Sequence, residues 1–182
     1  GTPNLGLITS TDLGETWTNV SLKGVTDFHA LAVMTAVDGV PHVFGIDPGK
    51  PRLQRSTDGG LTWSEGAELV ARDILVVDTT LYATTTEGLA VSEDDGISFT
   101  LDPTPPTLYL VAADHKGTLA GIDTTGTLWT RSPGQNWVHG HTVTGTPQAM
   151  AVDGARIYVA DDRGIAVTED AGATWIVLEV NG

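Results

Sequence analysis

Four aspartates occupy corresponding places in a short repeated pattern, and paired or clustered carboxylates are the groups that glycoside hydrolysis and cation binding require. These aspartates are Asp12, Asp58, Asp94 and Asp170. In each copy a Ser or Thr precedes the aspartate by two positions, and another Ser or Thr follows it by four. Because an aspartate with hydroxyls nearby can hydrogen-bond the backbone of a turn, we expect these carboxylates to be structural rather than catalytic.

The pattern occurs five times, at residues 10–17, 56–63, 92–99, 130–137 and 168–175. Its closing aromatic residues are 46, 36, 38 and 38 positions apart, and a period near 40 residues is typical of propellers and solenoids. The fourth copy has Ser132 in place of the aspartate. We expect the glycines to adopt turn conformations and the aromatic rings to pack between repeats. The residues assigned to the pattern are Asp12, Gly14, Trp17, Asp58, Gly60, Trp63, Asp94, Gly96, Phe99, Gly134, Trp137, Asp170, Gly172 and Trp175.

Short alternating apolar runs surround each copy of the pattern. The run directly before the pattern begins with a glycine, as at 88–92. Two more apolar runs come before that one, as at 149–152 and 157–160, and a fourth follows the pattern, as at 174–178. The second copy differs, with Arg52 in place of the glycine and a longer turn at 47–51. Four short strands per repeat, here called A to D, with no helical period predict an all-β fold, a β-propeller of four-stranded antiparallel blades. The pattern then lies at the turn between strands C and D.

The blade count predicts a partial propeller. We expect residues 1–182 to form a single β-propeller domain of about four and a half blades, with a partial blade at 1–23 and blades at about 24–70, 71–103, 104–143 and 144–182. Since the chain starts with Gly1 and not Met, we expect a processed product or a piece of a longer protein. Missing blades or another chain would complete the open edge, and a ring of four to five blades closed on itself is the alternative.

The repeated pattern resembles the Asp-box, also called the bacterial neuraminidase repeat, of β-propeller proteins. The wider chain, including residues 27–31, is similar to bacterial secreted propellers labelled glycosyl hydrolase or sialidase-like, which implies a secreted or bacterial cell-envelope location. Sialidases of that superfamily need an arginine cluster, a Tyr–Glu pair, an Asp acid and an Arg-Ile-Pro element. This chain has no Arg-Ile-Pro, and Tyr82, Tyr109 and Tyr158 lie within apolar runs. We therefore expect no sialidase activity from this chain alone.

A second set of acids lies in the turns between strands B and C, on the face opposite the Asp-boxes. Such a ring could bind a cation or hold a catalytic pair, although Asp is also a favoured turn residue. His29 begins an A strand beside Asp27, and imidazole with carboxylate suits several divalent metals. A divalent metal near His29 is the cofactor that these residue types would allow, and its identity stays unknown. The candidate binding residues are Asp27, His29, Asp47, Glu87, Asp123, Asp161 and Asp162.

The net charge of the chain limits the kinds of partner that it can bind. Nine Lys and Arg against 23 Asp and Glu leave a net charge of −14, which disfavours nucleic acid and anionic membrane surfaces. No apolar run approaches the length of a membrane-spanning helix, and no cysteine is present. The leading hypothesis is a non-catalytic binding or scaffold module that takes a protein or glycan through its acidic ligand face. The alternative is a sialidase-like or other glycoside hydrolase whose remaining catalytic residues lie in blades outside this chain. A third is assembly, with strand addition completing the first blade.

Overall fold

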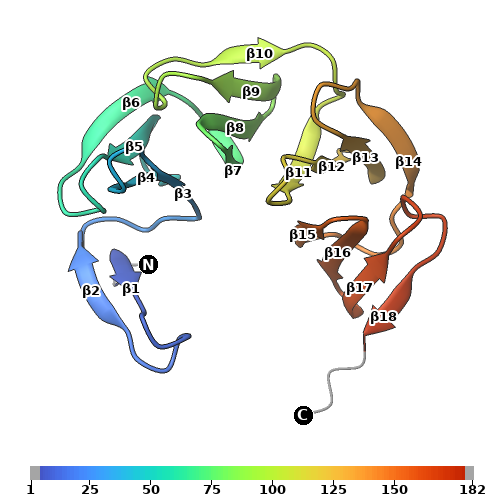
Figure 1. The fold of residues 1–182 in the computed structure, drawn as a ribbon, viewed down its shortest axis with the longest axis horizontal. Coiled ribbons are helices and arrows are strands. Elements are labelled where there is room, and N and C mark those ends of the chain that lie inside the picture. Colours follow the sequence, from blue (N-terminus) through green and yellow to red (C-terminus); the bar gives the residue numbers. More distant parts are fainter. Residues whose placement is uncertain (1–4, 179–182) are drawn as a thin grey trace. The chain divides into compact units, whose positions relative to one another are not determined.

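The protein is built from antiparallel β-strands, and the computed structural model describes residues 5–178 (Figure 1). One sheet has two strands and four sheets have four strands each. Within every sheet the strands lie in chain order, so hairpin turns join them and each sheet is a meander. The predicted all-β fold of four-stranded antiparallel blades is confirmed.

Each sheet lies within one of the five ranges predicted as blades. The two-stranded sheet is β1 (Leu7–Thr9) and β2 (Thr18–Ser21). The four-stranded sheets are β3 (Ala30–Thr35), β4 (Pro41–Ile46), β5 (Arg52–Ser56) and β6 (Ser64–Glu68); β7 (Ala71–Val77), β8 (Thr80–Thr85), β9 (Gly88–Ser92) and β10 (Thr100–Asp102); β11 (Leu108–Ala113), β12 (Leu119–Asp123), β13 (Thr127–Arg131) and β14 (Val138–Thr142); and β15 (Ala149–Asp153), β16 (Arg156–Asp161), β17 (Gly164–Thr168) and β18 (Ile176–Leu178). No helix long and apolar enough to span a membrane occurs in the part of the chain described.

Burial explains why the strands differ in composition. The second strands of two four-stranded sheets are largely buried: all five residues of β12 and four of the six in β4. The fourth strand is largely open, and every residue of β18 is exposed. Apolar runs therefore mark the inner strands, and the outer strands β6 and β14 carry mainly polar side chains. The outer strand β18 is an exception, because its three residues are apolar although exposed.

The chain divides into two compact units, each with its own apolar core. The first comprises described residues 5–81 and 92–99, and Phe44 and Leu53 are fully buried in it. The second comprises residues 82–91 and 100–178. Its core is a cluster of seven buried side chains: Leu110, Ala120, Ile122, Leu128, Val143, Ile157 and Val159.

Candidate functional site

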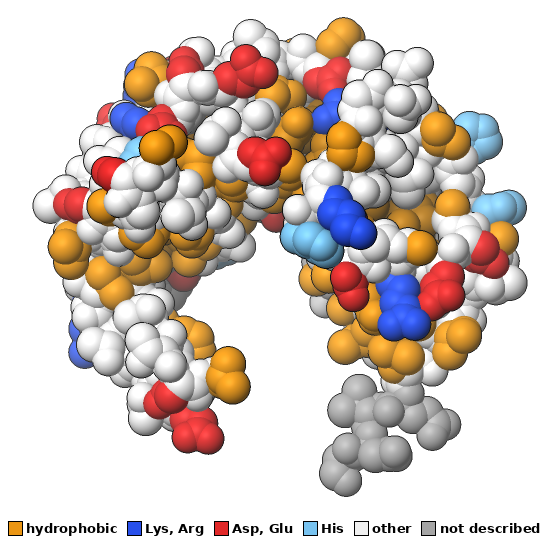
Figure 2. Space-filling view, viewed as in Figure 1, with side chains coloured by type: hydrophobic (Ala, Val, Ile, Leu, Met, Phe, Trp, Pro, Cys, Tyr) orange, Lys and Arg blue, Asp and Glu red, His pale blue; other side chains and the backbone are white. Residues whose placement is uncertain are grey.

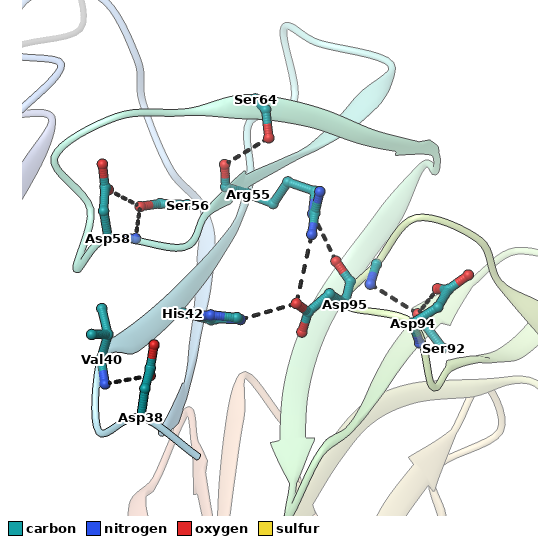
Figure 3. A network of polar contacts seen from close by, with 11 residues as sticks. Asp38, Val40, His42, Arg55, Ser56, Asp58, Ser64, Ser92, Asp94 and Asp95 are labelled. Carbon is teal, nitrogen blue, oxygen red and sulfur yellow. Dashed lines mark hydrogen bonds and ion pairs between the residues drawn. The ribbon is translucent and has the colours of Figure 1, made fainter. Parts of the chain in front are cut away.

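In each intact Asp-box turn, hydroxyl and backbone N–H groups of the same turn donate hydrogen bonds to the aspartate carboxylate. At the second copy, Ser56 Oγ donates a hydrogen bond of 2.7 Å to Asp58 Oδ1, and the Thr62 backbone N–H donates one of 2.9 Å to the same oxygen. The Thr62 hydroxyl donates to Asp58 Oδ2 at 2.6 Å. Figure 3 shows the Ser56 and Asp58 pair and the matching Ser92 and Asp94 pair. The same bonds surround Asp12 and Asp170.

These donors hold the four carboxylates in the ionised form. The pKa of Asp58 falls from 3.8 to about 2, first because the Thr62 hydroxyl and then because the Thr62 backbone N–H favours the anion. Asp12 and Asp94 respond in the same way to Thr16 and Ser98. At Asp170, where the Thr174 backbone is the leading donor, the pKa is also about 2. A carboxyl group this acidic is a poor proton donor near neutral pH.

The intact turns have an unusual backbone. The two residues after the aspartate both have positive φ, for example Asp95 at 61° and Gly96 at 73°, as in a type I′ hairpin turn. Leu13 and Ala171 take the same conformation without being glycine. The backbone bond across these turns is long, as in the 3.3 Å from Ile97 N–H to the Asp94 carbonyl. The side-chain network therefore supports turns that are strained in three of the four intact copies, while the second has Gly59 at this position.

The Asp-box turns also join neighbouring sheets within each unit. The Ala67 N–H of β6 donates to the Gly96 carbonyl at 2.8 Å, and the His141 N–H of β14 donates to the Ala171 carbonyl at 2.9 Å. A Cβ atom on Gly66 would overlap the Gly96 carbonyl oxygen, and one on Gly140 would overlap that of Ala171. The glycines of β6 and β14 thus allow the next turn to approach the outer strand closely.

Side chains add to the junction between β6 and the third Asp-box turn (Figure 3). Arg55 Nε donates to the Asp95 carbonyl at 2.8 Å, and Arg55 Nη2 lies 3.7 Å from the Asp95 carboxylate. His42 Nδ1 lies 3.0 Å from Asp95 Oδ2. Asp95 therefore connects its own turn to β4 and β5 of the preceding sheet.

The acids nominated in the B–C turns are also held by turn hydrogen bonds. Asp47 Oδ1 accepts from the Gly49 N–H at 2.8 Å. Asp123 Oδ1 accepts from the Thr125 and Thr127 N–H groups at 2.8 and 2.9 Å. Its other oxygen accepts from the Trp129 indole at 2.9 Å. Burial acts to raise the pKa of Asp123, but the Thr125 hydroxyl, which donates to Oδ1 at 2.7 Å, and the donors above outweigh it and lower the pKa.

The remaining B–C acids are similarly placed. Asp161 Oδ1 accepts from the Arg163 N–H at 2.8 Å and its carboxylate pairs with the Arg163 guanidinium, which lowers the pKa of Asp161. Asp162 accepts from the Thr146 N–H at 2.9 Å, and Glu87 is exposed. On the face drawn in Figure 2, acidic side chains lie scattered among others. A ligand-binding role for these acids stays a prediction.

Asp27 and His29 form an exposed pair, with 3.7 Å between Asp27 Oδ2 and His29 Nε2. Among residues 5–178, no group of three or more His, Asp or Glu side chains is arranged to hold a metal ion. The metal site predicted near His29 therefore has two candidate donors in this structure.

A pocket of about 380 Å³ lies beside the turn between β4 and β5, which is the longest of the B–C turns. It is lined by the end of β4 and that turn, residues 46–51, and by the link from β6 to the first residue of β7, residues 69–71. The Leu69 N–H donates to the Pro51 carbonyl at 2.9 Å and fastens the two segments together. The enlarged turn was visible in the sequence, but the apolar wall opposite it was not, because the two segments are about twenty residues apart.

Comparison with known proteins agrees with this geometry. The BNR/Asp-box repeat model matches residues 54–65, the second copy of the pattern. No curated protein matches the chain in sequence. Among solved structures, YCF48 bound to a D1 peptide aligns with 19% identity and a TM-score of 0.58, covering 95% of this chain and 62% of that one. YCF48 from Cyanidioschyzon merolae aligns at 20% identity and 0.58, over 93% and 62%.

Two further similar structures come from different contexts. A chain in a nidogen/laminin complex aligns at 16% identity and a TM-score of 0.70, covering 91% of this chain and 69% of that one. The GH74 enzyme of Niastella koreensis aligns at 22% identity and 0.58, over 97% and 29%. The chain thus spans about 62% of the length of the YCF48 chains. Together with the sheets and turns above, these likenesses define the protein as a β-propeller that carries BNR/Asp-box repeats.

Proposed function

We propose that this chain is a non-catalytic β-propeller module that binds a protein partner through the face carrying its B–C turns. The observation that carries the proposal is the pocket on that face, which the β4–β5 turn and the link between β6 and β7 form together. The carboxyl groups bear on the non-catalytic part of the proposal. In residues 5–178, every Asp whose pKa departs from the ordinary value has it lowered, as at Asp123 and Asp161. A glycosidase needs at least one carboxyl group with a raised pKa as its general acid.

The similar structures support a binding role for this fold. One is YCF48 bound to a D1 peptide, and another is part of a nidogen/laminin complex. The open pocket beside the β4–β5 turn gives the B–C face of the first unit a feature that a partner could enter.

Site-specific photo-crosslinking tests the proposal. A photoreactive residue would replace Val70, which is 76% exposed at the pocket, or Val37, which is fully exposed in the turn between β3 and β4. In an extract of the source organism we expect one discrete adduct with a polypeptide from Val70 and none from Val37. Equal labelling at both positions, or at neither, contradicts binding through the B–C face.

A glycoside hydrolase is the second candidate, and the GH74 likeness favours it. In that case the remaining catalytic residues lie outside this chain, and Asp123 and Asp161 are its best acids. Hydrolysis of aryl glycosides and of a panel of oligosaccharides by the full-length protein, with any blades outside this chain present, would distinguish the two functions. We expect no turnover above that of a D123N/D161N double variant, whereas a rate abolished in that variant would establish the enzyme.

We also propose that the protein is secreted or held in the bacterial envelope. A separate proposal is that the β1–β2 sheet gains strands from elsewhere, in the same protein or in another chain. This sheet has two strands where the others have four, and β1 pairs only with β2 in the described chain. Native mass spectrometry of the purified chain distinguishes the cases. A dimer or a complex supports strand addition in trans, and a single 19.0 kDa species contradicts it.

A further inference from the structure

The pocket beside the β4–β5 turn differs from the other B–C turns in having a wall supplied by a second segment. Residues 46–51 line it from the β4–β5 turn, and residues 69–71 line it from the link between β6 and β7. Because the Leu69 N–H bonds the Pro51 carbonyl, the pocket is built by the fold and not by a single loop. Its volume, about 380 Å³, is at the small end of the range for ligand sites.

The walls are aliphatic. Ile46 and Leu69 are buried at the base, and Pro48, Pro51 and Val70 are exposed at the rim. No aromatic side chain lines the pocket, so it lacks the ring faces on which sugars commonly stack. An aliphatic group is the best fit for such a site, because its binding removes apolar surface of both the group and the pocket from water.

One cation lies in the pocket at a defined position. Lys50 Nζ donates to Thr26 Oγ1 at 3.0 Å and to Gln54 Oε1 at 3.4 Å. The Asp47 carboxylate is 3.9 Å away, beyond hydrogen-bond distance but close enough to balance the charge. Thr26, Gln54 and Asp47 are all buried, so the ammonium of the pocket-lining Lys50 has fixed partners.

The third ammonium proton is available to a bound group. A neutral acceptor such as a peptide carbonyl fits this proton. A carboxylate fits less well, because Asp47 lies beside the ammonium and the chain carries a net charge of −14.

We propose that this pocket receives an aliphatic side chain of a protein partner while Lys50 donates a hydrogen bond to a neighbouring backbone carbonyl of that partner. The inference rests on the proposed function and names the contact by which the B–C face would bind. It assigns the site to a peptide with a branched aliphatic residue and no carboxylate beside it.

Amide NMR spectra of the whole chain, titrated with N-acetyl-leucinamide, test the site directly. We expect saturable shifts at Gly49, Val70 and Ala71 in the millimolar range. N-acetyl-leucine, which adds a carboxylate, should bind several-fold more weakly at neutral pH. Stronger binding of N-acetyl-leucine, or saturable shifts that map elsewhere, would overturn the assignment, and so would the absence of any saturable shift.

Three variants sharpen the test. Val70→Asp should abolish the shifts, and Val37→Asp, a matched change at an exposed valine outside the pocket, should leave them intact. Lys50→Met should weaken binding about tenfold, the usual effect of losing a hydrogen bond from a charged donor. Binding that survives Val70→Asp contradicts the proposal even if Lys50→Met does not fold. If Val70 crosslinks to a partner while N-acetyl-leucinamide does not bind, the proposed function stands and this inference fails.

Discussion

The junctions between neighbouring sheets are made in two ways, and the fourth Asp-box shows the difference. At β6 and β14 an outer-strand N–H bonds a carbonyl of the next turn across a glycine. The position four residues after the closing aromatic is Ala67 or His141 there, but it is Pro103 after Phe99. Proline has no N–H, so this bond cannot form between β10 and the fourth turn.

Side chains make the junction at the fourth turn instead. Asp102, which takes the place of Gly66 and Gly140, forms an ion pair of 3.1 Å with Arg131. The Arg131 guanidinium also lies 5.1 Å from the centre of the Trp137 ring and 5.6 Å from that of Tyr82. The ion pair to Asp102 and the contact with the Tyr82 ring cross between the sheets and therefore replace a backbone hydrogen bond, while Trp137 packs on Arg131 within its own hairpin.

The fourth turn itself also dispenses with the aspartate. Its central residues are Pro133 and Gly134, whose φ is 70°, and the Gln135 N–H donates to the Ser132 carbonyl at 3.0 Å. Proline followed by glycine suits a type II turn, which needs no non-glycine residue at positive φ. The comparison teaches that a turn can lose the Asp-box carboxylate where proline and glycine relax its backbone. Three of the four turns that keep the carboxylate hold a non-glycine residue at positive φ, and the second copy has Gly59 there.

The largest predicted effect comes from blocking a backbone junction. Gly66→Ala should lower the free energy of unfolding by about 3 kcal/mol, because the new Cβ overlaps the Gly96 carbonyl oxygen. Gly134→Ala, whose Cβ would meet open space at positive φ, should cost about 1 kcal/mol. Urea unfolding followed by tryptophan fluorescence measures both. Equal losses would show that the close approach at Gly66 contributes nothing.

The side-chain junction should be next in size. Arg131→Ala should cost about 2 kcal/mol, because it leaves the half-buried Asp102 carboxylate without its cation and removes two ring contacts. Arg156→Ala, which removes the exposed ion pair to Glu169, is the control and should leave the unfolding midpoint unchanged. Similar midpoint shifts for the two variants would contradict a special role for Arg131.

Acidification should lower the stability contributed by a turn that has the aspartate, but not that of the fourth turn, which has Ser132 instead. The folded pKa of Asp58 is about 2 against an ordinary 3.8, so its stabilisation is fully present above pH about 4 and is lost as pH falls through about 2. We expect Asp58→Asn to flatten the fall in stability between those values, whereas Ser132→Ala should leave it as in the wild type. Urea midpoints at pH 5, 4, 3 and 2 supply the comparison, and parallel profiles for all three proteins would speak against the low pKa.

The smallest effect concerns turn strain. Ala171→Gly should stabilise the protein by about 0.5 kcal/mol, because relief of the positive φ of 55° exceeds the added entropy of the unfolded chain. Gln135→Gly, in the relaxed fourth turn, should be neutral or destabilising. Thermal unfolding is sensitive enough to rank the two, and a loss of stability in both would mean that the intact turns carry no strain.

Much of this molecule could be predicted from local pattern. The strands, their hairpin connections and the turn role expected of the aspartates depend on residues close together in the chain, and the pattern occurs five times. The weakened fourth copy was also visible, as Ser132 and Asn136. The loss of the aspartate from the fourth copy was therefore predictable, but the Arg131 contacts that form the junction at this turn were not.

The replacement depends on residues far apart in the chain. Arg131 meets Asp102 and Tyr82 across 29 and 49 positions, and Asp95 reaches Arg55 across 40. The pocket likewise needs residues 69–71 to close over the β4–β5 turn. The conformation of a turn can be predicted from neighbouring residues because the hydrogen bonds that stabilise the turn are local. Junctions and pockets arise where separate sheets pack, and the shape of that packing is set by all the side chains together.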